Sequence, residues 1–150
     1  TATILLLTSG TSQVYYGDES ARDLTIKEAI GDATLRSFMN WDDIEEDNDT
    51  KKILNHWQKL GHFRANHMSI GAGKHELISE ESGLVFSRVR NNDKVVVGIN
   101  LPKGKKVINV SSVFKNEDLI YDFYSNTSTK VLAGKVAINS EYDIVLLEKK

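Results

Sequence analysis

The run of four apolar residues at positions 4–7, Ile-Leu-Leu-Leu, constrains the fold of this chain more than any other feature. A short, continuous apolar run without alternation predicts a strand that is buried on both faces, as in a parallel sheet covered by helices. Each crossover between parallel strands takes a dozen or more residues, so the neighbours of this strand cannot lie upstream within the chain. The sequence therefore predicts that residues 3–8 form one strand of a larger parallel sheet.

The segment that follows carries side chains suited to a site. Residues 15–19 read Tyr-Tyr-Gly-Asp-Glu, which places two aromatic rings, a glycine turn and two carboxylates beyond the carboxyl end of the predicted strand. Proteins with parallel α/β sheets build their sites at that edge of the sheet. Tyr15, Tyr16, Asp18 and Glu19 are therefore the first candidates for a functional role.

Four segments, taken in order along the chain, resemble motifs of the α-amylase family of glycoside hydrolases: 10–19 (GTSQVYYGDE), 36–42 (RSFMNWD), 60–67 (LGHFRANH) and 95–101 (VVVGINL). The first two resemble the end of the last barrel strand and a loop motif, with Ser12 and Phe38 standing where the family carries proline. The third resembles the final barrel helix, and the fourth a valine-rich strand of the C-terminal domain. Together with residues 56–59 (HWQK), these segments look most similar to bacterial periplasmic or secreted α-amylases.

The resemblance implies an α+β fold. Residues 1–72 would supply the last strand, a long loop and the last helix of a (β/α)8 barrel, and residues 73–150 an antiparallel Greek-key β-sandwich. The family's catalytic carboxylates lie after earlier barrel strands, so this chain is not expected to contain them. We therefore expect the C-terminal portion of an α-amylase-type hydrolase of α-1,4-glucans such as starch, which completes and braces the barrel and is inactive alone.

Between the first strand and the helix, residues 20–50 show no sustained periodicity. We expect a long loop there, with a short helical turn near residues 25–30. The acidic tract at residues 42–49 is expected to be a solvated surface, because its spacing does not match a calcium-binding loop.

Residues 50–67 carry apolar side chains at helical spacing, which predicts the principal helix of the chain. Asp49 or Thr50 can serve as its N-cap. Gly61 lowers the helix propensity by about 1 kcal/mol relative to alanine, which suggests close packing against a neighbour.

From residue 73 onward the pattern changes to short β-branched or aromatic runs separated by turn residues. This spacing predicts an antiparallel sandwich or barrel. Eight strands are expected: residues 75–79, 84–90, 94–101, 106–110, 119–124, 129–132, 135–138 and 142–147.

Composition excludes several classes of protein. The formal net charge of −2 over 150 residues gives no electrostatic basis for binding nucleic acid. The absence of cysteine rules out disulfides and thiolate metal sites. The apolar run at the start is too short to span a membrane, so no membrane segment is visible.

The two adjacent carboxylates are poorly placed for catalysis. Retaining glycoside hydrolysis needs two carboxyl groups about 5–5.5 Å apart, on opposite sides of the scissile bond. Adjacent residues in an extended chain point to opposite faces, so Asp18 and Glu19 are not expected to converge on one substrate. We assign no catalytic residue to this chain. The two carboxylates are expected to line the barrel mouth, to bond loop backbone, or to orient Arg22 or Arg36.

The resemblance implies contact with the glucan for four residues: Tyr16, Asp18, Arg36 and Trp41. An aromatic ring at a barrel mouth can stack on a sugar, and a packed core tyrosine is the alternative for either Tyr15 or Tyr16. Arg36 could hold a carboxylate near the cleft and Trp41 could form a platform. A loop-to-barrel ion pair and a buried indole are the equal alternatives for those two residues.

The four histidines do not match a zinc-binding pattern, so no metal site and no cofactor are expected in this chain. His67 is expected to bond a loop carbonyl near the domain junction. Calcium, if the parent enzyme uses it, would bind in the part of the parent outside this chain.

Two other functions remain open at this stage. The chain could come from a non-catalytic relative with the same barrel and sandwich, of the transporter accessory subunit type, or act as a stand-alone structural or carbohydrate-binding module. The resemblance implies a periplasmic or secreted bacterial protein whose partner is the α-glucan substrate. An exposed strand at residues 3–8 would also make the isolated chain self-associate.

Overall fold

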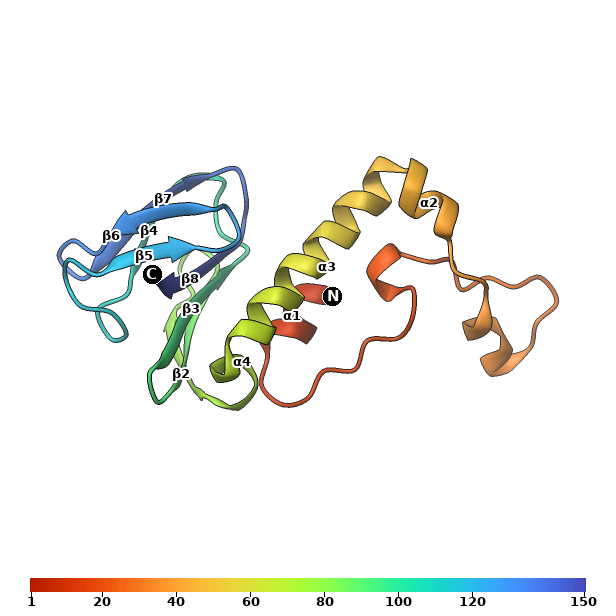
Figure 1. The fold of residues 1–150 in the computed structure, drawn as a ribbon, viewed down its shortest axis with the longest axis horizontal. Helices are drawn as coiled ribbons and strands as arrows, with labels where there is room; N and C mark the ends of the chain where they lie inside the picture. The colour runs from red at the N-terminus through yellow and green to blue at the C-terminus, as the bar shows by residue number, and fades with distance from the viewer. The chain divides into compact units, whose positions relative to one another are not determined.

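The computed structural model describes all 150 residues, which form two compact units (Figure 1). The first unit consists of Thr1–Leu6 and Thr11–Gly61, and the second of Leu7–Gly10 and His62–Lys150. Helix α3 (Asn48–Asn66) contributes residues to both.

The first unit is built from short helices and loops around the first part of α3. Besides α3 it contains helices α1 (Ala2–Leu7) and α2 (Trp41–Glu46) and the 3-10 helices η1 (Asp18–Ser20) and η2 (Gly31–Arg36). Extended loops join these elements, and hydrogen bonds between the loops hold them in place.

The prediction of a strand at residues 3–8 is wrong, because Ala2–Leu7 forms helix α1. All the strand pairs of this chain are antiparallel, so the chain supplies no parallel sheet for such a strand to join. A lone strand would leave its backbone groups unpaired, whereas a helix satisfies them locally, as when Leu5 N–H donates to Thr1 O at 3.1 Å. Alanine and leucine are also strong helix formers.

The loop predicted for residues 20–50 contains more helix than expected. The turn expected near residues 25–30 is not helical and has one backbone bond, from Ala29 N–H to Ile26 O at 3.1 Å. Helical turns occur instead in η2 and in α2, which takes up the start of the acidic tract. Asp42 and Asp43 lie in the first turn of α2, where negative charge stabilises a helix.

The predicted principal helix is confirmed as α3. Its cap is Asp47 rather than Asp49 or Thr50, because the Asp47 carboxylate accepts a hydrogen bond from Thr50 N–H at 2.6 Å. This hydrogen bond lowers the pKa of Asp47. The packing expected at Gly61 is absent, since a Cβ atom there would meet nothing within 4 Å.

Apart from Leu7–Gly10, the second unit consists of the end of α3, helix α4 (Met68–Ala72) and an antiparallel β structure. A strand occurs at each of the eight predicted positions: β1 (Lys74–Ser79), β2 (Leu84–Arg90), β3 (Asp93–Ile99), β4 (Gly104–Asn109), β5 (Leu119–Asp122), β6 (Thr127–Lys130), β7 (Lys135–Ser140) and β8 (Val145–Lys149). Six strands form one sheet in the order β1-β2-β3-β8-β5-β6, and β4 and β7 form a second. In Figure 1, β4 and β7 lie side by side.

The main core contains buried side chains from both sheets, for example Val96 and Leu147 from the large sheet and Ile108 and Ile138 from the small one. The other face of the large sheet is also covered. Helix α4 packs on β2 and β3, and the Phe63 ring of α3 lies with its centroid 5.5 Å from that of Phe123. Burial on both faces explains why β3 carries an unbroken valine run instead of alternating polar residues.

Candidate functional site

Two segments of the first unit, residues 15–22 and 35–40, are joined by hydrogen bonds. We call them the motif cluster; its bonding members are Tyr15, Tyr16, Gly17, Ser20, Arg22, Leu35, Ser37 and Asn40. The cluster contains residues 15–19 of the first family motif and residues 36–40 of the second.

A tight turn at Gly17 forms the first segment. Gly17 has a φ of 87°, in the left-handed region, and its carbonyl accepts a hydrogen bond from Arg22 N–H at 2.9 Å. A Cβ atom at Gly17 would lie 2.4 Å from Nε of Arg22. Only glycine therefore satisfies both the backbone conformation and the close approach of the arginine.

Arg22 is the centre of the motif cluster. The residue is 6% exposed, and its guanidinium donates to the carbonyls of Tyr16 (3.1 Å), Leu35 (3.2 Å) and Ser37 (2.9 Å), as well as to the Ser37 hydroxyl. It also lies over the Tyr16 ring, 4.0 Å from the centroid. The planar fork of donors lets one arginine join two segments at once, and the ring adds a cation–π contact.

The tyrosine and asparagine side chains reinforce the same junction. The Tyr15 hydroxyl donates to Leu35 O at 3.2 Å and the Tyr16 hydroxyl to Ser37 O at 3.0 Å. Further along, the Ser20 hydroxyl donates to Oδ1 of Asn40 at 2.7 Å, and Nδ2 of Asn40 donates to Ser20 O at 3.0 Å. The two tyrosine hydroxyls therefore hold the second segment of the cluster, residues 35–40, against the first.

The two adjacent carboxylates bond the backbone of their own loop. One Asp18 oxygen accepts from Tyr15 N–H at 3.2 Å, and one Glu19 oxygen accepts from Gly17 N–H at 3.0 Å. Bonding to loop backbone is one of the roles expected for them. Neither is hydrogen-bonded to Arg22, whose partners are carbonyl and hydroxyl oxygens.

The residues expected to contact substrate lie in or next to the cluster. Tyr16 and Asp18 belong to its first segment. Arg36 is exposed at the end of η2, directly after Leu35, and Trp41 begins α2 directly after Asn40 with 65% of its surface exposed. The first unit also holds a largely apolar cavity of about 390 Å³, lined by Tyr15, Tyr16, Trp57, Glu19 and Gln58 among others.

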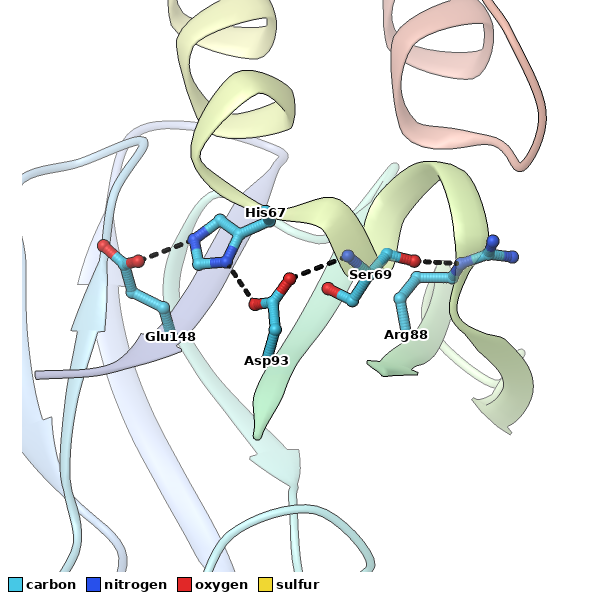
Figure 2. A network of polar contacts seen from close by, with 5 residues as sticks. All are labelled: His67, Ser69, Arg88, Asp93 and Glu148. Carbon is cyan, nitrogen blue, oxygen red and sulfur yellow. Dashed lines mark hydrogen bonds and ion pairs between the residues drawn. The ribbon is translucent and has the colours of Figure 1, made fainter. Parts of the chain in front are cut away.

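A second polar network surrounds His67 in the second unit (Figure 2). Nδ1 of His67 lies 2.7 Å from Oδ1 of Asp93 on β3, and Nε2 lies 2.6 Å from Oε2 of Glu148 on β8. The other Asp93 oxygen accepts from Ser69 N–H at 2.7 Å, and the Ser69 carbonyl accepts from Nε of the buried Arg88 at 3.2 Å. The network fastens the α3–α4 junction to the large sheet.

The expectation that His67 bonds a loop carbonyl is wrong, since its partners are two carboxylates. Burial alone would raise the pKa of Asp93, but the hydrogen bonds from His67 and from Ser69 N–H outweigh burial and hold that pKa below its usual value. No group of three or more His, Asp or Glu side chains in the structure is arranged to hold a metal ion.

The sequence alone did not identify the role of Arg22 or the carboxylate partners of His67. Three of the bonding partners of Arg22 are backbone carbonyls, 6, 13 and 15 positions away, and a backbone carbonyl cannot be recognised from the type of residue that carries it. Asp93 and Glu148 lie 26 and 81 positions from His67, and only the pairing of β3 with β8 brings them together.

Comparison with known proteins connects this geometry to a family. No family model matches the sequence. Over 96 residues the chain is 40% identical to the periplasmic α-amylase of Escherichia coli (strain K12), a match that covers 64% of this chain and 14% of that protein.

Solved structures give the same answer for the fold. An α-amylase of Anoxybacillus superposes with a TM-score of 0.69 at 24% identity, over 99% of this chain and 31% of that one. The α-amylase from Geobacillus thermoleovorans, solved with acarbose, gives 0.68 at 18% identity, over 99% and 32%.

The resemblance to the α-amylase family of glycoside hydrolases is thereby confirmed, and the fold matches the C-terminal regions of α-amylases. The chain spans 14% of the curated relative and about a third of each of these two solved chains. None of its helices is both long and apolar enough to cross a bilayer.

Proposed function

We propose that this chain is the C-terminal portion of an α-amylase-type glycoside hydrolase that acts on α-1,4-glucans in the periplasm or outside a bacterial cell. In that enzyme, residues 1–72 form the end of the (β/α)8 barrel region, to which α3 contributes the last helix, and residues 73–150 form the Greek-key sandwich that braces it. Support comes from the 40% identity to a periplasmic α-amylase.

The observation that carries the proposal is the motif cluster. The first two family motifs, residues 10–19 and 36–42, are separated by 16 residues in the sequence, yet the Tyr16 hydroxyl of the first donates to the Ser37 carbonyl of the second. Arg22, just after the first motif, donates to the same carbonyl. A chance resemblance gives no reason for the matched segments to meet in space.

Within the enzyme, the cluster would present its exposed side chains to the glucan. Trp41 offers an exposed ring on which a sugar can stack, and Asp18 retains one carboxylate oxygen for a sugar hydroxyl. Tyr16 and Arg36 would shape the same edge of the cleft. The carboxylates that perform hydrolysis would come from the rest of the enzyme, because Asp18 and Glu19 are each engaged by an N–H group of their own loop.

A segment exchange tests the proposal. The matching segment of the E. coli periplasmic α-amylase is replaced with this chain, and release of reducing sugar from soluble starch is measured. We expect the chimera to hydrolyse starch, and the same chimera with Arg22→Ala to be impaired. A chimera that has the circular dichroism of a folded protein but releases no sugar would contradict the proposal and favour the non-catalytic alternative.

A further inference from the structure

The open edge of β4 is a structural feature that the proposed function does not use. β4 pairs with β7 alone, and β1, the first strand of the large sheet, pairs with β2 alone. Residues of both open strands line two depressions of about 540 and 490 Å³, which share Ile78 and Asn109. We call this feature the β1–β4 groove.

Backbone groups of β4 point into the groove. Val110 N–H donates to Gly134 O at 2.8 Å, one step beyond the Asn109–Lys135 pair. Bonded and non-bonded pairs alternate along an antiparallel ladder, so the residues two and four positions before Val110 also bond β7. The backbone groups of Lys105, Val107 and Asn109 therefore face the open edge, where a further strand can pair with them.

The side chains around the groove differ between its two faces. On the inner face the groove is lined by the apolar residues Ile78, Val85, Leu101 and Ile108. On the outer face Val107 is 59% exposed, and the exposed Lys105 flanks it. Side chains alternate between the two faces of a strand. In a strand added beside β4, every second side chain would therefore contact the apolar inner face, and the others would lie beside Lys105.

The charge of the groove is predominantly positive. Lys105 and Lys135 are exposed on the outer face, and neither forms an ion pair in the structure. Lys106 adds a third positive charge; its nearly buried ammonium donates to the carbonyls of Gly104 and Ser140 at 2.9 Å. Two acidic residues line the groove: Glu81 in the larger depression, and Glu76 in the smaller one, where it is paired with Lys74 at 2.7 Å.

The lining also distinguishes between classes of ligand. No aromatic side chain lines either depression, so the groove lacks a platform on which a sugar ring could stack. Pairing with a second copy of β4 would bring like-charged strands together, which lysines on edge strands oppose. An extended peptide that carries acidic side chains needs no aromatic platform, and its charge is opposite to that of the lysines.

We propose that the β1–β4 groove binds an extended polypeptide segment in which acidic side chains alternate with small apolar ones, adding a strand to the open edge of β4. The apolar side chains enter the inner face beside Ile108, and the acidic ones lie beside Lys105. Backbone hydrogen bonds supply the affinity and the alternating pattern supplies the specificity. This proposal is independent of the glucan-hydrolase assignment.

The test uses the 150-residue chain and a capped six-residue peptide, the length of β4, in which glutamate alternates with valine. Amide NMR spectra and hydrogen exchange are followed during titration. We expect shifts, and slower exchange, at the amides of Lys105, Val107 and Asn109. A peptide with lysine in place of glutamate and the glucan maltoheptaose serve as the comparison ligands, and neither should shift those amides.

Two variants identify the binding edge. Val107→Pro removes an N–H group that does not bond β7, so the fold should persist while peptide binding is lost. Val107→Thr retains that N–H group and is the matched control. Lys105→Glu should weaken binding by about two- to fivefold, as expected for one exposed ion pair.

Several results would overturn the proposal. These are an absence of shifts at the three amides, equal binding of the lysine peptide, undiminished binding by Val107→Pro, or a response of the same amides to maltoheptaose. Shifts that depend on chain concentration without peptide would show that a second copy occupies the groove instead.

Discussion

The two units of this molecule are stabilised in different ways. The second unit buries a continuous apolar core between two sheets and satisfies its backbone through antiparallel ladders. The first unit joins its loops through the motif cluster and leaves large apolar side chains on its surface, including Ile30, Phe38 and Trp41. The second unit therefore has the features of a self-sufficient fold, while the first, the smaller of the two, exposes more large apolar side chains.

The largest expected effect in the first unit comes from Arg22→Ala. The substitution removes the hydrogen bonds to three carbonyls and the contact with the Tyr16 ring, so we expect a loss of about 3 kcal/mol in the stability of that unit. Both tryptophans lie in the first unit, so their fluorescence during urea unfolding reports on it. Arg22→Lys keeps the charge and should lose less. An unchanged midpoint in Arg22→Ala would show that the cluster does not stabilise the unit.

The corresponding change in the second unit is His67→Ala. Two carboxylates would lose their shared partner, and we expect a loss of about 2 kcal/mol, measured by circular dichroism of the β structure. The exposed His62, a few residues earlier, is the control, and His62→Ala should have little effect. Equal effects of the two substitutions would mean that the His67 network contributes nothing specific.

The same network predicts a pH dependence. The folded-state pKa of Asp93 is lowered, so its contribution to stability is complete above the unfolded pKa of about 3.9 and is lost as pH falls through the folded value. The difference in stability between the wild type and Asp93→Asn should therefore shrink below about pH 4. A difference that stays constant down to pH 2 would contradict this account of Asp93.

A smaller effect should separate two glycines. Gly61→Ala places a methyl group where nothing lies within 4 Å, so better helix propensity should stabilise the chain by up to about 1 kcal/mol. Gly73→Ala is the contrasting variant in the second unit. Its Cβ atom would lie 2.5 Å from Ser69 O and 2.9 Å from Val89 O, so this substitution should destabilise the chain. Thermal unfolding of both variants measures the difference, and destabilisation by Gly61→Ala would reveal packing that the structure does not show.

The smallest effect on stability is expected at Phe38, which is 97% exposed. Phe38→Ser should change the free energy of unfolding by less than about 0.5 kcal/mol. We propose that the isolated chain self-associates through the apolar surface of the first unit, so the same variant should sediment as a smaller species. Identical sedimentation of wild type and variant would exclude Phe38 from any association.

The contrast between the units also explains which helices and strands could be predicted from the sequence and which could not. All eight strands and α3 were found from local patterns, because each strand pairs with others of this chain and α3 has its own apolar periodicity. The run at residues 4–7 predicts a strand because it is short, continuously apolar and without alternation. It is helical because no parallel partner is present, and strand formation depends on a partner in a way that helix formation does not.

In the motif cluster, too, some features could be predicted from the sequence and others could not. Its residue types were visible in the Tyr-Tyr-Gly-Asp-Glu run, and the backbone bonds of Asp18 and Glu19 agree with one of the roles predicted for them. The function of Arg22 was not predictable, because a buried arginine that bonds only carbonyls and a hydroxyl has no complementary acid to reveal it. The N-cap of α3 is Asp47, whereas the sequence predicts Asp49 or Thr50. All three are residue types that cap helices well, so residue type alone does not distinguish them.

The most direct test of the central claim is hydrolysis by the 150-residue chain itself. The chain is incubated with amylose at high concentration and reducing ends are counted, beside the segment-exchange chimera at the same concentration. Our account predicts product from the chimera and none from the chain alone, whose adjacent carboxylates serve the backbone of a loop. Reducing sugar released by the isolated chain, and abolished by Asp18→Asn or Glu19→Gln, would contradict it.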